Sequence, residues 1–387
     1  MSSVLGTYAR KNISFVEGKG SYLFSDKGDK YLDFVQGIAT NILGHCHEHL
    51  VKTINEQSKK LWHVSNAFLI PDQEKLAKRL TDKTFADFVC FQNSGTEATE
   101  ASIKIARKYF HNIGKPEKNR IITFKGAFHG RTLAALFAAN NPKHIEGFGP
   151  KVDGFDQVPF ADHEAVKKAI NKNTAAIMLE TIMGEGGIKV VPDFCLKGLR
   201  ELCDENGILL ILDEVQSAYR TGNFFAFDKS GIVPDIVPIA KGIGGGFPLG
   251  ACLLTKKVSV GMSPGSHGST FGGNPLAMAV GNAVLDIIFE KNFLKDVELK
   301  GEYFHNGLKK IKEKYPKIIE EIRGIGLIKG LKMIVDNTEF IKKLMDQKML
   351  TIKAEENVIR LFPPLIVSNN EIDEAISKIE TVCKEMS

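Results

Sequence analysis

Residues 208–247 read ILLILDEVQSAYRTGNFFAFDKSGIVPDIVPIAKGIGGGF, and this stretch decides the fold. Ile208 to Leu212 is wholly aliphatic and is followed directly by Asp213, whereas Asp235 to Ala240 is mostly apolar and is followed directly by Lys241. Short apolar runs with turn residues on either side are typical of buried strands. The stretch therefore predicts two buried strands, each followed at its carboxyl end by a charged side chain.

The separation of Asp213 and Lys241 matches one strand-helix-strand unit, which takes roughly 30 residues. The two strands of such a unit are parallel, so their carboxyl ends meet at the same edge of the sheet. A carboxylate and an amine are therefore expected to lie close together, where one ligand could contact both.

The same alternation extends along the chain in both directions. Further strand-like runs are Phe88 to Phe91, Arg120 to Phe124, Ala175 to Leu179 and Ala251 to Leu254. Between them lie helical patterns, with apolar positions at Ala98, Ala101, Ile105 and Tyr109, and with Phe194 to Asn206 ending at Gly207. The sequence thus predicts an α/β fold with a mainly parallel central sheet and helices on both faces.

From about Leu285 the sequence changes to lysine-rich amphipathic helices with short strands, which predicts a smaller α+β domain. Tyr22 to Phe34, with Gly28 at a turn, is expected to form a hairpin that joins it. The predicted division is an N-terminal segment at 1–48, a large ligand-binding domain at 49–284 and a small domain at 285–387. The elements expected in the small domain are helices at Leu294 to Lys314 and at Glu339 to Gln347, the second behind a Thr338 cap, and strands at Gly330 to Val335 and Val358 to Leu361.

Composition excludes several classes of protein. Lysine and arginine number 51 against 46 acidic residues, a net charge of +5 with no long basic run, so a nucleic-acid partner is not expected. The cysteines at 46, 90, 195, 203, 252 and 383 form no CxxC pair, which argues against a disulfide framework. Met1 to Lys30 lacks the apolar stretch of a signal peptide, and the longest aliphatic run is far shorter than the roughly 20 residues of a membrane helix. A cytoplasmic protein without a membrane partner is expected.

Two segments suit one kind of ligand. The strand that ends near Phe91 is followed by Gln92-Asn93-Ser94-Gly95-Thr96 at a helix start, where free amides and hydroxyls favour phosphate, although a simple cap reinforced by Glu97 explains the same residues. Lys241 precedes a glycine-rich segment that a planar ligand could approach closely, although it could also be a solvated loop lysine. Together with Asp213 as an acid for a ring nitrogen, these segments suit pyridoxal phosphate.

Seven segments, in the right order between about Tyr31 and Ile372, resemble those of the class III (ornithine-type) pyridoxal phosphate aminotransferases, and most closely the acetylornithine aminotransferases. The resemblance implies the fold type I of pyridoxal phosphate-dependent transferases. The segments are Gly44-His45-Cys46-His47, Gln92-Asn93-Ser94-Gly95-Thr96-Glu97-Ala98, Phe128-His129-Gly130-Arg131-Thr132, Gly184-Glu185-Gly186-Gly187, Leu212-Asp213-Glu214-Val215-Gln216, Ala240-Lys241-Gly242 and Ser269-Thr270-Phe271-Gly272-Gly273-Asn274-Pro275.

The resemblance implies a role for each residue around the cofactor. Lys241 carries the cofactor and then moves the proton between the substrate carbon and the cofactor carbon, while Asp213 keeps the ring nitrogen protonated. The other implied contacts are Gln216 on the ring hydroxyl, Val215 and Phe128 on the two ring faces, Ser94, Gly95 and Thr96 on the phosphate, and Thr270 on the phosphate of the neighbouring subunit. A homodimer with shared active sites follows from the last of these.

Four residues are expected to bind the substrate. The resemblance implies that Arg131 grips the carboxylate remote from the reacting carbon, a role that suits the bidentate hold of a guanidinium, and Ser269 is a candidate substrate contact. Glu185 is expected to neutralise Arg360 while an acylated amine is bound, and to release it for the α-carboxylate of glutamate.

The activity implied is transfer of the side-chain amine of N2-acetyl-L-ornithine to 2-oxoglutarate in arginine biosynthesis. It is a ping-pong reaction whose products are N-acetyl-L-glutamate 5-semialdehyde and L-glutamate. Succinyl-diaminopimelate, as in lysine biosynthesis, and ornithine or 4-aminobutyrate are alternative amine donors.

Two readings from other classes fit the sequence less well. For a nicotinamide-dependent oxidoreductase, Gly242, Gly244 and Gly246 miss the dinucleotide spacing. A catalytically silent scaffold would leave the presence of both Lys241 and Asp213 unexplained. No metal is expected either, because His45, Cys46, His47 and His49 are crowded together without a second group of ligands.

Overall fold

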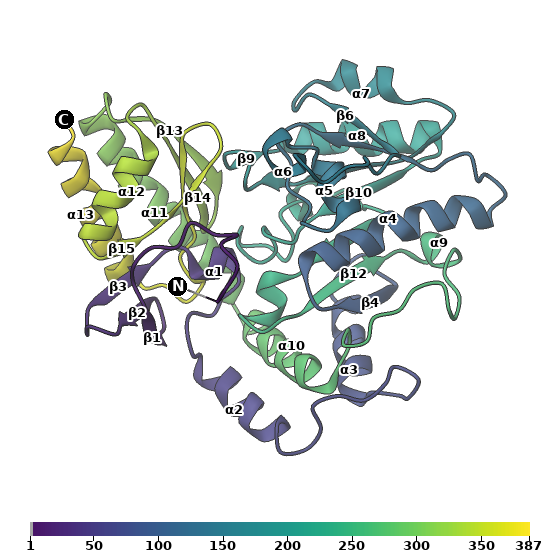
Figure 1. Cartoon of the computed structure of the whole chain (residues 1–387), viewed down its shortest axis with the longest axis horizontal. Helices are drawn as coiled ribbons and strands as arrows, with labels where there is room; N and C mark the ends of the chain where they lie inside the picture. Colours follow the sequence, from purple (N-terminus) through teal and green to yellow (C-terminus); the bar gives the residue numbers. More distant parts are fainter. Residues whose placement is uncertain (1–2) are drawn as a thin grey trace.

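The computed structural model describes residues 3–387 and contains a central seven-stranded sheet (Figure 1). β10 pairs in parallel with β7 and β11, β5 pairs in parallel with β6 and β7, and β12 runs antiparallel to both of its neighbours. The predicted mainly parallel sheet is therefore confirmed, with β6 as a strand that was not predicted. In sheet order the strands are β4 (Phe88–Gln92), β12 (Gly250–Leu254), β11 (Ile236–Ile239), β10 (Leu209–Asp213), β7 (Thr174–Glu180), β5 (Arg120–Phe124) and β6 (Phe155–Val158).

The sheet is buried on both faces, and β10 shows why its strands read as continuous apolar runs. Successive side chains of a strand point to opposite faces. Leu210 and Leu212 belong to the same hydrophobic cluster as residues of α8 (Asp193–Asn206), whereas Leu209 and Ile211 belong to a second cluster with α4 (Gly95–Asn112) and α5 (Leu133–Ala139). Gly207 ends α8 in a left-handed conformation, as its sequence predicts.

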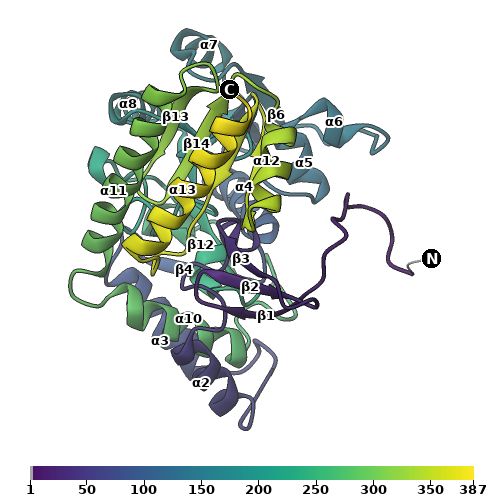
Figure 2. The same cartoon turned by 90° about the vertical axis from the view of Figure 1, so that its left-hand side faces the viewer.

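A second sheet lies beside the first and is covered on one side by three helices (Figures 1 and 2). The order of its strands is β13 (Ile319–Ile325), β14 (Ile328–Met333), β17 (Val358–Leu361) and β16 (Ile352–Ala354). The helices are α11 (Phe293–Lys314), α12 (Asn337–Asp346) and α13 (Asn369–Glu385). The prediction of a Thr338 cap for α12 is wrong: the side chain of Asp336 accepts from the backbone N–H of Glu339 at 2.8 Å, so the helix begins before Thr338.

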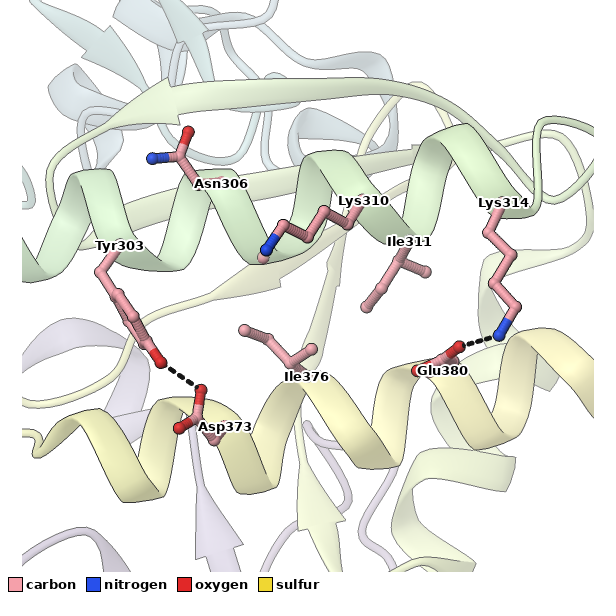
Figure 3. A pocket seen from close by; sticks show the side chains of 9 residues that line it. Tyr303, Asn306, Lys310, Ile311, Lys314, Asp373, Ile376 and Glu380 are labelled. Atoms are coloured by element: carbon pink, nitrogen blue, oxygen red, sulfur yellow. Dashed lines mark hydrogen bonds and ion pairs between the residues drawn. The ribbon is translucent and has the colours of Figure 1, made fainter.

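A surface groove of about 450 Å³ runs between α11 and α13 (Figure 3). Tyr303 donates a hydrogen bond to Asp373 (2.7 Å) and Lys314 pairs with Glu380 (2.5 Å), so each contact joins the two helices across the groove. All residues that line the groove belong to α11 and α13, so it shares no residue with the carboxyl edge of the central sheet.

The N-terminal hairpin pairs with the C-terminal part of the chain. β2 (Tyr22–Ser25) and β3 (Lys30–Asp33) are antiparallel, and β3 pairs in parallel with β15 (Met349–Leu350). Phe34 also accepts a backbone hydrogen bond from Phe362, just beyond β17. These bonds bring the first strands of the chain and its last strands together beside the central sheet.

The remaining elements connect these layers. No helix within residues 3–387 is both long enough and apolar enough to cross a membrane. The connecting elements are β1 (Phe15–Lys19), α1 (Gln36–Ala39), α2 (Glu48–Gln57), α3 (Pro71–Thr81), α6 (Pro142–Ile145), α7 (His163–Ala169), β8 (Ile182–Met183), β9 (Lys189–Val190), α9 (Lys256–Ser259), α10 (Pro275–Ile288) and 3-10 turns at Asp228–Ser230 and Lys241–Gly244.

Candidate active site

Asp213 is the last residue of β10 and lies buried at the carboxyl edge of the central sheet. The backbone N–H of Val215 donates to its Oδ1 (3.0 Å), and Nδ1 of His129 lies 2.8 Å from its Oδ2. A carboxylate can only accept, so Nδ1 of His129 carries the hydrogen of this bond. Asp213 is thus held in place by two donors, and the imidazole leaves Nε2 buried without a protein partner among residues 3–387.

Glu180 is a second buried carboxylate beside Asp213. It ends β7 and is the residue paired with Asp213 in the β7–β10 register. Burial and the charge of Asp213 raise the pKa of Glu180 to about 7, while His129 and the backbone N–H donors of Phe128 (2.8 Å) and Gly184 (3.2 Å) act in the opposite direction. Burial also opposes a charge on His129, but the hydrogen bond and charge of Asp213, with that of Glu180, raise its pKa. The two groups with raised pKa values, His129 and Glu180, therefore both lie beside Asp213.

Lys241 follows β11 at the same edge of the sheet as Asp213, because β10 and β11 are parallel. Its backbone is in the left-handed region at φ 48°, a conformation that non-glycine residues rarely adopt and that is concentrated at functional sites. Burial and the nearby charge of Arg360 lower the pKa of the Lys241 amine to about 8, whereas Glu180 and Asp213 act to raise it. About a tenth of the amine is therefore neutral at pH 7, against less than about a thousandth for an ordinary lysine, and the neutral form is the one that a nucleophile or base requires.

The start of α4 forms the other end of the site. Ser94 caps this helix, since its side chain accepts from the backbone N–H of Glu97 (3.3 Å) and donates to the Glu97 carboxylate (3.0 Å). The simple cap considered from the sequence is therefore present. The backbone N–H groups of Gly95 and Thr96 have no acceptor among residues 3–387, so they remain available to an anion.

Thr96 has a task that the sequence did not reveal. Its Oγ1 accepts from the backbone N–H groups of Arg131 (3.1 Å) and Thr132 (3.2 Å), and so fixes the loop that carries Arg131. Gly130 makes this approach possible: its φ is 134°, and a Cβ atom there would lie 2.2 Å from Oγ1 of Thr96. The Thr96 side chain is thus turned toward the arginine loop.

Three residues expected to surround a cofactor ring lie near these groups. A Cβ atom at Gly95 would meet Cγ1 of Val215 at 2.6 Å, so the helix start and the loop after β10 are in close contact. Gln216 follows Val215 and has a buried Oε1 without a protein partner among residues 3–387. Phe128 is linked to Glu180 through its backbone N–H.

Two arginines are expected to bind the carboxylates of the substrates. Arg131 is exposed, whereas Arg360 in β17 is buried and pairs with Oε2 of Glu185 at 2.7 Å. Burial lowers the pKa of Arg360, and Glu185 opposes that effect. The backbone of Glu185 also accepts from Glu355 (2.9 Å), so beside this ion pair the segment between β8 and β9 contacts the segment between β16 and β17.

Ser269 lies beside the start of α4, because its Oγ accepts from Nδ2 of Asn93 (3.1 Å). Thr270 is exposed, and its side chain makes no hydrogen bond with the described residues 3–387. The chain by itself therefore brings Ser269 toward Asn93 and leaves Thr270 at the surface.

The family model "Aminotransferase class-III" matches residues 7–383. The chain belongs to the class III aminotransferases. Members of this family are transaminases that use pyridoxal phosphate.

Relatives of this class III aminotransferase are similar over their whole length. An acetylornithine aminotransferase of Mesorhizobium japonicum is 54% identical over 387 residues, which cover 100% of this chain and 97% of that protein. The crystal structure of N-acetylornithine aminotransferase from Stenotrophomonas maltophilia superposes with a TM-score of 0.86 at 33% identity, covering 98% of this chain and 97% of that one. An ornithine aminotransferase structure from Toxoplasma gondii, described with partial occupancy of PLP at its active site, gives a TM-score of 0.94 at 30% identity, covering 98% and 92%.

The residues of this class III aminotransferase fit pyridoxal phosphate. The site offers two unsatisfied helix amides for a phosphate, a held carboxylate for a ring nitrogen and a lysine amine with a lowered pKa. The buried Nε2 of His129 and Oε1 of Gln216 have no protein partner among residues 3–387, as expected of atoms that line a polar ligand site. The donor set thus matches the anion, the ring and the aldehyde of that cofactor.

Sequence reasoning missed His129, Glu180 and the structural use of Thr96. His129 stood inside a quoted motif without a role. Glu180 could have been found by the argument used for Asp213, since it also follows directly after an apolar strand. The bond from Thr96 to the Arg131 loop joins residues far apart in the sequence, so no local pattern reveals it.

Proposed function

We propose that this class III aminotransferase moves the side-chain amine of N2-acetyl-L-ornithine to 2-oxoglutarate, and forms N-acetyl-L-glutamate 5-semialdehyde and L-glutamate by a ping-pong mechanism in arginine biosynthesis. Support comes from relatives 47–54% identical over essentially the whole chain that are acetylornithine aminotransferases. N-acetylornithine and glutamate react in the same site but differ in charge next to the reacting carbon. The site must therefore be able to change its own charge at that place.

The Glu185–Arg360 ion pair is the observation that carries this proposal. The carbon that loses its amine in N-acetylornithine bears no carboxylate, whereas the reacting carbon of glutamate does. A buried Arg360 neutralised by Glu185 at 2.7 Å suits the first substrate, and release of that pair would expose a cation for the second. Glu185 is 37% exposed, so it can move toward solvent when the pair opens.

Arg131 is suited to bind the carboxylate that both substrates share. N-acetylornithine and glutamate each carry a carboxylate remote from the reacting carbon, and an exposed guanidinium can hold it through two parallel hydrogen bonds. We infer that Arg131 takes this carboxylate in both half-reactions and that Ser269 contacts the substrate nearby. The acetyl group removes the positive charge of the α-amine, which would otherwise lie close to Arg131.

Within this proposal, each remaining residue acts on a stated atom. Bound pyridoxal phosphate supplies an electron sink for the carbanion that forms at the substrate carbon. Lys241 would hold the cofactor and, as a neutral amine, would carry a proton from that carbon to the cofactor carbon. Asp213, held by His129 and Val215, would keep a proton on the ring nitrogen, which strengthens the sink. The residues that would hold the group are Ser94, Gly95, Thr96, Phe128, Val215, Gln216 and, from a second subunit, Thr270.

We also infer a cytoplasmic homodimer with shared active sites. The exposed Thr270 and the exposed apolar side chains of Trp62 and Phe271 support a second copy of the chain at this face. Sedimentation of the purified protein measures the oligomeric state. In the dimer, a T270A variant should lose the phosphate contact and bind the cofactor with lower affinity.

The amine donor is decided by single-turnover measurements on the cofactor-loaded protein. N-acetylornithine, N-succinyl-diaminopimelate, ornithine and 4-aminobutyrate are compared, and the conversion of the cofactor to its amine form is followed by absorbance. We expect N-acetylornithine to react fastest. A faster reaction with free ornithine would contradict the proposal, and a faster reaction with the succinylated donor would move the enzyme to lysine biosynthesis.

A further inference from the structure

His144 in the short helix α6 lies against the arginine that faces the remote end of the substrate. The guanidinium of Arg131 donates from Nη2 to Nε2 of His144 at 3.3 Å. The imidazole also meets the Phe128 ring edge to face, with centroids 6.3 Å apart and planes at 88°. His144 is half-buried, and neither the cofactor contacts nor the proton transfers described above make use of it.

The direction of this bond fixes the protonation of His144. A guanidinium has only donors, so Nε2 must accept and the imidazole must be neutral with its hydrogen on Nδ1. Burial and the charge of Arg131 lower the pKa of His144, with Lys143 adding to this effect, while Glu185 and Glu355 act to raise it. The neutral form that the geometry requires is therefore the form present near neutral pH.

The guanidinium of Arg131 has few other anchors. Its backbone N–H is fixed by Thr96, and its guanidinium carbon lies 5.4 Å from the centroid of the Phe128 ring. An exposed arginine has many rotamers, and fixing it before the substrate arrives reduces the entropy lost on binding. His144 provides the protein acceptor that selects one of these orientations.

A chain of contacts connects the helix that carries His144 to Arg360. The neighbouring Lys143 pairs with Glu355 at 3.4 Å, and the backbone N–H of Glu355 donates to the carbonyl of Glu185 at 2.9 Å. Glu185 in turn holds Arg360. The helix that carries His144 therefore touches the segment next to the Glu185–Arg360 pair.

We propose that His144 is a positioning residue that orients Arg131 toward the remote carboxylate of both substrates, and so sets the affinity of the enzyme for amine donors that carry such a carboxylate. This inference rests on the proposed function, because it takes Arg131 as the carboxylate-binding group. It assigns to α6 a part in substrate selection that none of the sequence motifs indicated.

Two substitutions separate orientation from packing. His144→Phe keeps a flat ring beside Phe128 but removes the acceptor, whereas His144→Gln places an amide oxygen where it can accept from Arg131. In the holoenzyme we expect H144F to raise the KM for N-acetylornithine and for glutamate about tenfold, with kcat within about twofold of the wild-type value. H144Q should restore most of the lost affinity, and both variants should keep the wild-type melting temperature and cofactor absorbance.

A double-mutant cycle with Arg131→Met completes the test. If His144 acts through Arg131, H144F lowers kcat/KM in the wild-type background and changes it by less than about twofold in the R131M background. Equal losses in both backgrounds, a loss of kcat with KM unchanged, or wild-type KM values in H144F would each overturn the inference. Failure of the wild-type enzyme to accept N-acetylornithine would instead count against the proposed function, and the KM for glutamate would still decide the role of His144.

Discussion

Asp213 and Glu180 are register partners on neighbouring parallel strands, so two carboxylates end side by side at a buried edge of the central sheet. Two adjacent buried carboxylates cannot both ionise without a large cost. The imidazole of His129, 2.8 Å from Asp213, compensates one of the two charges. Burial and the charge of Asp213 meanwhile raise the pKa of Glu180 to about 7. The edge of the sheet thus places Asp213 between a hydrogen-bonded imidazole and a carboxyl group whose pKa is raised.

The His129–Asp213 bond predicts a defect in chemistry rather than in substrate binding. His129→Leu removes a hydrogen bond that holds the Asp213 carboxylate in place, so this carboxylate is less well oriented toward a ring-nitrogen proton. We expect single-turnover rates to fall by about 10- to 100-fold in both half-reactions, with substrate affinity nearly unchanged. His129→Asn keeps a donor near the position of Nδ1 and should recover part of the rate, whereas equal rates in H129L and wild type would refute the role.

The lowered pKa of Lys241 predicts how the cofactor-free protein takes up pyridoxal phosphate. Only the neutral amine attacks an aldehyde, so the rate of uptake should rise about tenfold per pH unit and level off near pH 8. The visible absorbance of the bound cofactor measures this rate. Lys241→Ala should retain no cofactor after borohydride reduction and denaturation. A midpoint near the ordinary lysine value, about 10.4, would show that the amine is not perturbed.

Removal of Arg360 should separate the two half-reactions. Arg360→Met deletes the cation proposed to bind the α-carboxylate of glutamate, so we expect the glutamate half-reaction to slow about 100-fold or more and the N-acetylornithine half-reaction to slow less than about fivefold. Glu185→Gln should do the reverse, because it leaves Arg360 charged while the acylated amine is bound. Stopped-flow single turnovers with each donor measure both effects. Equal damage to the two half-reactions in R360M would rule out the switch.

The fold could be predicted from the sequence because its strands are buried on both faces. Ile208 to Leu212 and Asp235 to Ala240 stand out as apolar runs, and the observed strands β10 and β11 match them within about a residue. β6 was not predicted because Phe155–Val158 has two polar residues at its centre and so does not stand out as an apolar run. The cap of α12 was misassigned by two residues, since Asp336 and Thr338 are both good capping residues and only the structure shows which one bonds.

The site was harder to predict than the fold. Asp213 and Lys241 could be found because both follow buried parallel strands, whose carboxyl ends share one edge of the sheet. The helix expected between these strands is wrong, since their connection contains only the 3-10 turn Asp228–Ser230. The bonds of His144 to Arg131 and of Thr96 to the Arg131 loop depend on loops whose paths are set by tertiary packing. Local spacing contains no information about such contacts.

The buried Glu214 predicts an unusual dependence of stability on pH. Its side chain accepts from Ser217 Oγ (2.6 Å) and from the backbone N–H of Ala226 (3.1 Å), yet burial raises its pKa to about 7. Between pH 4.5, its ordinary pKa, and pH 7, the folded protein therefore keeps a proton that the unfolded chain has lost. The free energy of unfolding should thus fall as the pH rises through this range, and Glu180 adds to the same slope.

Glu214→Gln should remove a large part of this slope, because a neutral amide has the same shape and needs no proton. Above pH 7 we expect the variant of the cofactor-free protein to be more stable than wild type by up to about 3 kcal/mol, with the smallest difference near pH 4.5, where the glutamate is protonated in the folded state. Urea denaturation at intervals of half a pH unit measures the effect, and the exposed Glu205→Gln serves as a matched control that should leave the slope unchanged. If E214Q keeps the wild-type slope, ionisation of Glu214 does not limit the stability of the folded protein, and the burial of this carboxylate must be compensated by its two donors.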